Sequence, residues 1–201
     1  GLLMTILICW LVPIIIVVAL AGILLNRSYM DSVQQEIDAS AENALRLVQM
    51  QVEDAVKDSK AVSYDGVVRS AYHGYLQSGD SAALYGEVSN YLSQNFTREE
   101  MYRAVFIHFW DVDTGAYVLT QGTTGYDLLR KCQTHAPQIL EDMEDADTDI
   151  RIRLVGDHLY MARNLLDSTF TPYATVAMLL DPAELFRPLD AVSRVDQVQY
   201  Y

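Results

Sequence analysis

The first twenty-five residues, Gly1 to Leu25, contain no charged side chain, and sixteen of them are Leu, Ile or Val. A helix of this length would extend about 36 Å, enough to cross a hydrocarbon core of roughly 30 Å. In lipid it satisfies its own backbone hydrogen bonds, of which Pro13 removes one and so kinks the span. A soluble core helix this long would show a polar stripe. The sequence therefore predicts a transmembrane helix over residues 1–27.

A cleaved signal peptide is the main alternative for this segment. Ala19-Leu20-Ala21 has the small-x-small pattern of a cleavage site. However, the apolar region is longer than that of a signal peptide, and no basic region precedes it. Because the chain starts at Gly1 rather than Met, we expect a basic cytoplasmic segment before it. We therefore expect the helix to remain as an anchor.

All the charge lies beyond the apolar segment. The chain has 27 acidic and 14 basic residues, a formal net charge of −13. Such a surface repels phosphate backbones, so we expect no nucleic-acid partner. A long acidic domain can cross a membrane despite its charge, and we expect it to be extracytoplasmic, with Arg27 as the one flanking charge. Cys9 lies in the apolar segment, which leaves Cys132 without a partner for an intrachain disulfide.

Hydrophobic periodicity predicts helices directly after the anchor. Apolar and small residues recur at spacings of three and four from Tyr29 to Val56, and no Gly or Pro interrupts them. They predict a stalk helix over residues 28–62. Its stripe contains little Leu, which favours packing against its own domain over an autonomous coiled coil. Two shorter helices are expected over Val67–Gln77 and Ser81–Asn95, the second capped by Asp80.

The period then changes to that of strands. Gly156-Asp157 is a strong hairpin signal, and the nearly continuous apolar run Tyr173–Leu180 suits the middle of a sheet. Pro137 is expected in the first turn of a helix through Met143. Asp181 and Pro182 should begin a helix that ends near Leu189, with another strand over Arg194–Tyr201. Five antiparallel strands are expected, over residues 102–111, 116–120, 150–155, 158–166 and 173–180, with helices on one face in an α+β domain.

Motifs for catalysis or metal binding are absent from the sequence. The four histidines show no HExxH spacing, and there is no G-x-S-x-G, G-x-G-x-x-G or Walker lysine loop. Asp111 begins a segment like a calcium loop, but Ala116 occupies the sixth position, where an EF-hand needs Gly. The acidic run 141–149 is interpreted as a solvated loop, and loose calcium binding is left open. We therefore expect no enzyme activity in this chain, no cofactor and no metal site.

Several segments carry a family resemblance: Val105–Gly115, His158–Asp167 and Phe170–Phe186. Together with the anchor and the stalk helix, they resemble the extracytoplasmic Cache (PAS-like) sensor region of a transmembrane receptor. Within that class the chain most resembles the amino-terminal part of YesM-type sensor histidine kinases. The resemblance is one of strand–turn–strand rhythm, and it spans essentially the whole chain.

The resemblance implies a membrane-distal Cache module over residues 63–190 and the start of a membrane-proximal module over 191–201. A returning transmembrane helix, a HAMP linker and the kinase core would follow. It further implies a homodimer and a cytoplasmic response regulator as partners. The sequence has no phosphoacceptor histidine box, so the kinase assignment depends on resemblance alone.

A ligand pocket is expected on the sheet face beside the helical insert 121–149. Arg163 and Asp167 are candidates because each is charged within or next to an apolar strand. The alternatives are that Arg163 pairs with Asp167 or faces solvent, and that the candidate aromatic residues are ordinary core. Those residues, which could supply flat walls or hydroxyl donors, are Trp110, Tyr117, Tyr160 and Tyr173.

These observations predict the sensing part of a membrane-bound two-component histidine kinase. Its ligand would be an unknown small molecule or peptide, and its signal would pass through the stalk and transmembrane helices. A chemotaxis receptor or cyclase with the same sensor is one alternative. A membrane-anchored surface binding module without signalling is another.

Overall fold

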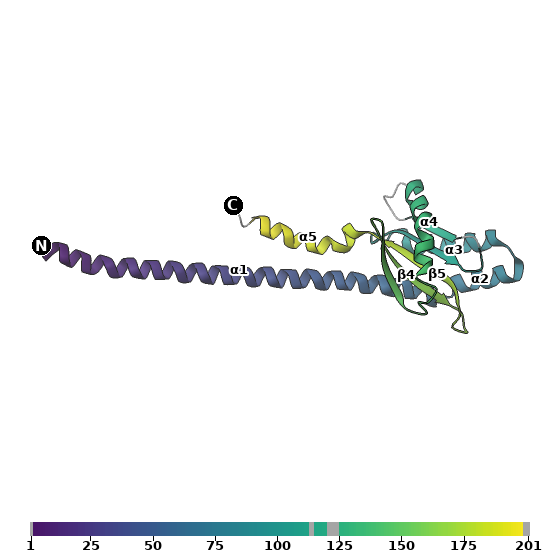
Figure 1. Cartoon of the computed structure of the whole chain (residues 1–201), viewed down its shortest axis with the longest axis horizontal. Helices are drawn as coiled ribbons and strands as arrows, with labels where there is room; N and C mark the ends of the chain where they lie inside the picture. The colour runs from purple at the N-terminus through teal and green to yellow at the C-terminus, as the bar shows by residue number, and fades with distance from the viewer. Residues whose placement is uncertain (1, 113–114, 120–124, 199–201) are drawn as a thin grey trace. The chain divides into compact units, whose positions relative to one another are not determined.

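The computed structural model describes the backbone of residues 2–112, 115–119 and 125–198, and the side chains of 14–112, 115–119 and 125–190 (Figure 1). The chain divides into two compact units, which are Gly1–Leu47 with Pro188–Tyr201, and Val48–Arg187. One helix, α1, runs without interruption from Leu2 to Tyr64. The predicted stalk is thus helical throughout, and it is continuous with the apolar segment.

The apolar part of α1 is exposed to its surroundings. Between Ile14 and Leu25, the large apolar side chains are 52–72% exposed. Such a surface is unfavourable in water and favourable in hydrocarbon. Within the described residues, α1 contains the one segment that is long and apolar enough to cross a membrane.

The second unit contains a five-stranded antiparallel sheet with strand order β2-β1-β5-β4-β3. Every side chain from Tyr173 to Leu180 is buried, so the apolar run forms the central strand as predicted. Gly156 has φ 63° in the β3–β4 turn, which suits glycine and confirms the predicted hairpin. The strands are β1 (Tyr102–Phe109), β2 (Gly115–Leu119), β3 (Ile150–Val155), β4 (His158–Leu166) and β5 (Pro172–Leu180). Residues 113–114 of the predicted β1–β2 turn lie outside the described residues.

Helices cover both faces of the sheet, whereas the sequence pattern predicted them on one face (Figure 1). Val176 and Met178 of β5 belong to a core shared with the end of α1, α2 (Val67–Ser78) and α3 (Ser81–Phe96). Ala177 and Leu179 belong to a second core under α4 (Gly125–Glu141). A strand with buried side chains on both faces requires this two-sided cover.

Two helix boundaries differ from prediction. Pro137 lies inside α4, because Leu128, Cys132 and Ile139 form an apolar stripe that begins well before it. Helix α5 runs from Pro182 to Val198. The strand predicted over Arg194–Tyr201 is therefore wrong for residues 194–198, and residues 199–201 lie outside the described part. Pro188 removes one backbone donor without ending α5, and no glycine follows it.

The starts of α3 and α5 follow the predicted capping, whereas α2 starts after Gly66 without a side-chain cap. The Asp80 carboxylate accepts hydrogen bonds from the backbone N–H groups of Ala82 and Ala83, each at 3.0 Å. The Asp181 carboxylate accepts one from Ala183 at 3.0 Å. Each bond satisfies a backbone donor that a helix leaves free in its first turn.

Candidate functional site

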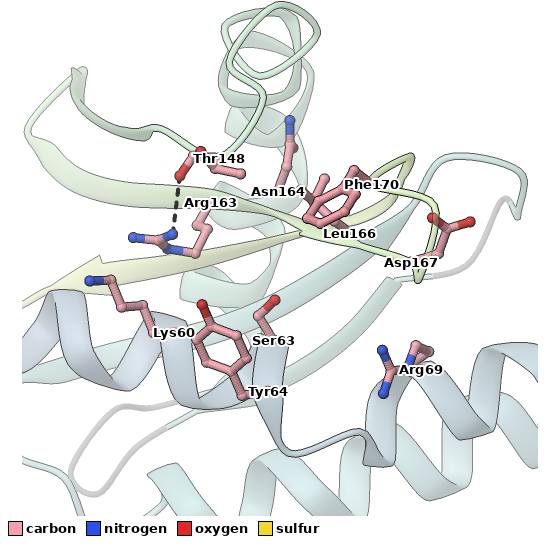
Figure 2. Close-up of a pocket in the computed structure, with 10 residues that line it drawn as sticks. All are labelled: Lys60, Ser63, Tyr64, Arg69, Thr148, Arg163, Asn164, Leu166, Asp167 and Phe170. Atoms are coloured by element: carbon pink, nitrogen blue, oxygen red, sulfur yellow. Dashed lines mark hydrogen bonds between the residues drawn. The ribbon is translucent and has the colours of Figure 1, made fainter.

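A pocket of about 210 Å³ lies between the end of α1 and strand β4 (Figure 2). We call it the basic pocket, because its lining contains three cationic side chains and one carboxylate. Its walls come from the last turns of α1, the start of α2, the segment after α4, strand β4 and the β4–β5 turn. The lining residues are Lys60, Ser63, Tyr64, Arg69, Thr148, Arg163, Asn164, Leu166, Asp167 and Phe170.

Arg163 reaches the pocket because of its place on β4. Met161 and Leu165, its neighbours on the same face of the strand, are buried in the core shared with α1. Arg163 Nε donates to Ser59 Oγ at 3.1 Å, and Nη1 donates to the carbonyl oxygen of Thr148 at 3.0 Å. The side chain is half-buried, and burial lowers the pKa of its guanidinium, which nevertheless stays charged.

The hydrogen bonds of Arg163 go to neutral oxygens, and the Asp149 carboxylate favours its charge from beyond ion-pair distance. Within the described side chains, no carboxylate lies within ion-pair distance of Arg163. The alternative that Arg163 pairs with Asp167 is therefore wrong. Charges removed from water are normally paired, but Arg163 is half-buried without an ion-pair partner. Its guanidinium therefore retains both charge and donor capacity for a further group.

Ser59 connects the sheet to α1. It is 1% exposed, and its hydroxyl donates to the Val56 carbonyl at 2.7 Å. That bond directs the hydrogen into the helix and leaves the oxygen free to accept from Arg163. A second bond nearby joins α1 to strand β1 of the same sheet, since the Tyr102 hydroxyl donates to the Asp58 carboxylate at 2.7 Å.

Asp167 shapes the turn that closes one end of the pocket. Its Oδ1 accepts from Thr169 N at 2.8 Å, Thr169 Oγ1 at 2.7 Å and Thr171 N at 2.9 Å. The hydrogen bonds from Thr169 and Thr171 hold the pKa of the Asp167 carboxyl below its usual value. Phe170, within the same turn, has φ 62° and is 81% exposed.

The pocket is locally basic on an acidic protein. Lys60, Arg69 and Arg163 face a single lining carboxylate, that of Asp167, whereas the whole chain carries −13. None of these three cations forms an ion pair within the described part of the chain. The local charge favours an anionic ligand over a cationic one.

The six predicted site residues do not converge. Arg163 and Asp167 line the basic pocket. Tyr173 lies in the core on the same face of the sheet, where its ring stacks on Tyr72 with centroids 5.0 Å apart. Burial raises the pKa of each of these two hydroxyls to about 12. The other three belong to the face covered by α4, and they are Trp110, Tyr117 and Tyr160.

Tyr160 is the most deeply enclosed of those three. Its hydroxyl lies 3.0 Å from His135 Nδ1 and donates to Cys132 Sγ at 3.8 Å. Burial raises the pKa of both the Tyr160 hydroxyl and the Cys132 thiol. This network joins β4 to α4 and fits a core role.

A second hollow, of about 680 Å³, lies beside α4 at the β2 edge of the sheet. Tyr117 lines it, together with Leu119, Leu129 and Gln133. A hollow beside the helical insert was expected, but Arg163 and Asp167 do not line it. Its described lining contains no charged side chain, so it offers less chemistry than the basic pocket.

The acidic run 141–149 forms no cation site within the described residues. Asp142 pairs with Arg153, while Met143 and Ala146 turn inward and are buried. Within the described residues, no three His, Cys, Asp or Glu side chains are grouped closely enough to hold a metal ion.

The sequence did not indicate eight of the ten lining residues, which are Lys60, Ser63, Tyr64, Arg69, Thr148, Asn164, Leu166 and Phe170. The spacing of Lys60 and Tyr64 places both on one side of a helix, which was the available signal. No protein-family model matches the chain, and a search of curated proteins gave no match. The pocket and α1 are therefore the features from which a function can be inferred.

Proposed function

We propose that this chain is the ligand-sensing part of a membrane-anchored receptor, with the basic pocket as its sensing site. One observation carries the proposal. The single helix α1 contains both the apolar segment Ile14–Leu25 and three residues of the pocket wall, Lys60, Ser63 and Tyr64. A change at the pocket therefore acts on the same helix that would cross the membrane.

The contacts of α1 with the sheet support this coupling. Ala55 and Val62 are buried in the core, and the Ser59–Arg163 and Asp58–Tyr102 bonds join the helix to β4 and β1. A ligand that engages Arg163 competes with or strengthens its bond to Ser59. If it binds one position of the helix more tightly than another, it shifts the equilibrium between them.

The finer assignment is an extracytoplasmic Cache-like sensor of a two-component histidine kinase. Its support is the sequence resemblance and the agreement of the five-stranded antiparallel sheet and flanking helices with the fold that this resemblance implies. A long acidic domain can cross a membrane despite its charge, which is compatible with an extracytoplasmic position. Homodimer formation and transfer to a response regulator stay predictions of the resemblance.

Anchoring and orientation are tested together by labelling in cells. Ser70 is exposed on α2, so Ser70→Cys offers a new thiol, whereas the native Cys132 is buried. We expect the variant to stay with membranes after alkaline carbonate extraction and to react with a membrane-impermeant maleimide on intact cells. The unsubstituted chain is the control for background labelling. Labelling only after lysis would exclude the outside location, and release by carbonate would exclude the anchor.

Sensing is tested on the full chain in phosphatidylcholine nanodiscs. Small acids, amines and sugars are screened for an increase in melting temperature, which a ligand of the folded state must produce. We expect a binding compound to slow amide exchange in residues 48–64 of α1. If no compound raises the melting temperature, or if binding leaves exchange in this segment unchanged, the sensing proposal is wrong.

A further inference from the structure

We propose that the basic pocket binds a small monocarboxylate that carries a flat aromatic group, an inference that rests on the sensing function proposed above. Arg163 would bind the carboxylate, and the rings of Tyr64 and Phe170 would cover the flat group. The proposal combines three independent features of the pocket, which are its charge, its rim and its size.

Arg163 has hydrogen-bond donors to spare for a ligand. A guanidinium has five N–H donors, and the bonds to Ser59 and Thr148 use one from Nε and one from Nη1. Nη2 makes no hydrogen bond within the described structure. A carboxylate can take two parallel hydrogen bonds from a guanidinium and neutralise its charge, which a neutral ligand cannot do.

The three lining cations and the Asp167 carboxylate sum to +2, and their placement favours a ligand carboxylate at the Arg163 end of the pocket. Lys60 is exposed, and the Asp167 carboxylate lines the other end of the pocket from Arg163 (Figure 2). A second anionic group on the ligand would approach that carboxylate, which repels it, and Arg69, which lies at the same end (Figure 2). A single carboxylate held at Arg163 avoids this repulsion.

Two exposed aromatic side chains lie at the rim of the basic pocket. Tyr64 is 82% exposed at the end of α1, and Phe170 is 81% exposed in the β4–β5 turn. Figure 2 shows Phe170 beside Leu166 on one side of the opening and Tyr64 on the other. Together they offer apolar surfaces from two different elements of the fold.

Phe170 also has an unfavourable backbone conformation. Its φ of 62° lies in the left-handed region, which a bulky residue rarely adopts because the backbone is strained there. Its ring is outside both cores, so folding gains little from it. A strained, exposed phenylalanine at a pocket rim is explained if its ring contacts a ligand.

The volume of the pocket limits the size of the ligand. A cavity of roughly 150 Å³ holds one benzene molecule. The basic pocket, at about 210 Å³, therefore has room for one aromatic ring with a carboxylate, but not for a peptide.

The test uses isothermal titration calorimetry on the full chain in phosphatidylcholine nanodiscs, with empty nanodiscs as the blank. The probes are benzoate, its neutral isostere benzamide, and acetate, which lacks the ring. We expect benzoate to bind at least tenfold more tightly than either of the other two. Equal binding of benzoate and benzamide, or no benzoate binding up to millimolar concentration, would overturn the proposal.

Matched variants assign the contacts. Arg163→Gln should weaken benzoate binding at least tenfold, whereas Arg151→Gln, which removes an exposed arginine from β3, should leave it unchanged. Phe170→Gly should weaken benzoate binding without lowering the melting temperature. If Arg163→Gln and Arg151→Gln behave alike, or if Phe170→Gly binds benzoate normally, the proposed contacts are wrong.

The same samples separate this proposal from the sensing function. If a different compound from the screen slows exchange in residues 48–64 while benzoate does not bind, the ligand class is wrong and sensing is supported. If benzoate binds as described without changing that exchange, the ligand class is supported and sensing is wrong.

Discussion

Replacing Ser59 by alanine removes the hydrogen bond that joins α1 to β4. The serine is 1% exposed and accepts from Arg163 Nε at 3.1 Å, so no water can readily replace its oxygen. Arg163 then keeps one bond, to the Thr148 carbonyl, and its Nε loses its acceptor. The change removes a single oxygen atom, together with its bond to the Val56 carbonyl, and leaves the packing of α1 otherwise intact. We therefore expect the loss to come from the hydrogen bond rather than from a cavity.

The size of the effect follows from the charge and exposure of Arg163. A hydrogen bond to a charged group contributes about 1.5–3 kcal/mol to stability. Because Arg163 is half-buried, water compensates for part of this loss, and we expect Ser59→Ala to cost about 1–2 kcal/mol. For a chain of 201 residues this lowers the melting temperature by roughly 2–8 °C.

The assay is urea unfolding of the full chain in nanodiscs, followed by tryptophan fluorescence. Ser70→Ala, an exposed serine of α2, should stay within about 0.5 kcal/mol of the unsubstituted chain. In a double-mutant cycle, Ser59→Ala and Arg163→Gln should be non-additive by about 1 kcal/mol, because either change breaks the same bond. Additive effects, or a Ser59→Ala cost no larger than that of Ser70→Ala, would refute the coupling of helix and sheet.

Two further predictions concern stability. Phe170→Gly should raise the free energy of unfolding by about 1 kcal/mol, because glycine adopts φ 62° without strain and the ring is 81% exposed. The control Ser168→Gly should not raise it, because Ser168 has no positive φ. Destabilisation by Phe170→Gly in a urea titration would show that the backbone at this position is not strained. Burial and the neighbouring His158 lower the pKa of His135, so the folded state favours the neutral ring. The resulting contribution to stability is complete above the usual histidine pKa of about 6.5 and is lost as pH falls below it. His135→Gln should therefore flatten the decline in melting temperature between pH 7 and pH 5, whereas the exposed His73→Gln control should keep it, and equal slopes would exclude His135 as the cause.

Periodicity predicted the elements whose patterns are local. The alternation of Ile150–Val155, the Gly156-Asp157 turn and the apolar run of β5 each specify strand geometry within a few residues. The apolar run also contained an unused signal. A strand with no polar alternation is buried on both faces, so Tyr173–Leu180 already required helices on each side of the sheet.

The errors came where one residue type was given too much weight. Pro137 was interpreted as a helix start, although the stripe from Leu128 to Ile139 specified a helix that contains it. The β-branched and aromatic residues after Arg194 suggested a strand, but helix α5 continues through Val198. Proline and β-branched residues are weak local signals, which neighbouring helix turns can outweigh.

The basic pocket could not be predicted because its parts are distant in sequence. Ser59 and Arg163 are 104 residues apart, and their contact depends on how α1 is rotated against the sheet. No residue pattern specifies that rotation. The position of Phe170 at the pocket could not be predicted either, because phenylalanine is rarely found at positive φ and no turn signal predicts it there.

The burial of Ala55, Ser59 and Val62 has a practical consequence for separating the sheet domain from the apolar segment of α1. A chain shortened to begin at Val67 would look complete, since it keeps every strand, yet it would uncover one face of the sheet and leave Arg163 without its serine acceptor. A chain beginning at Val48 keeps all of these contacts. The boundary at which a water-soluble fragment can be cut therefore falls in the middle of a helix and not in a loop.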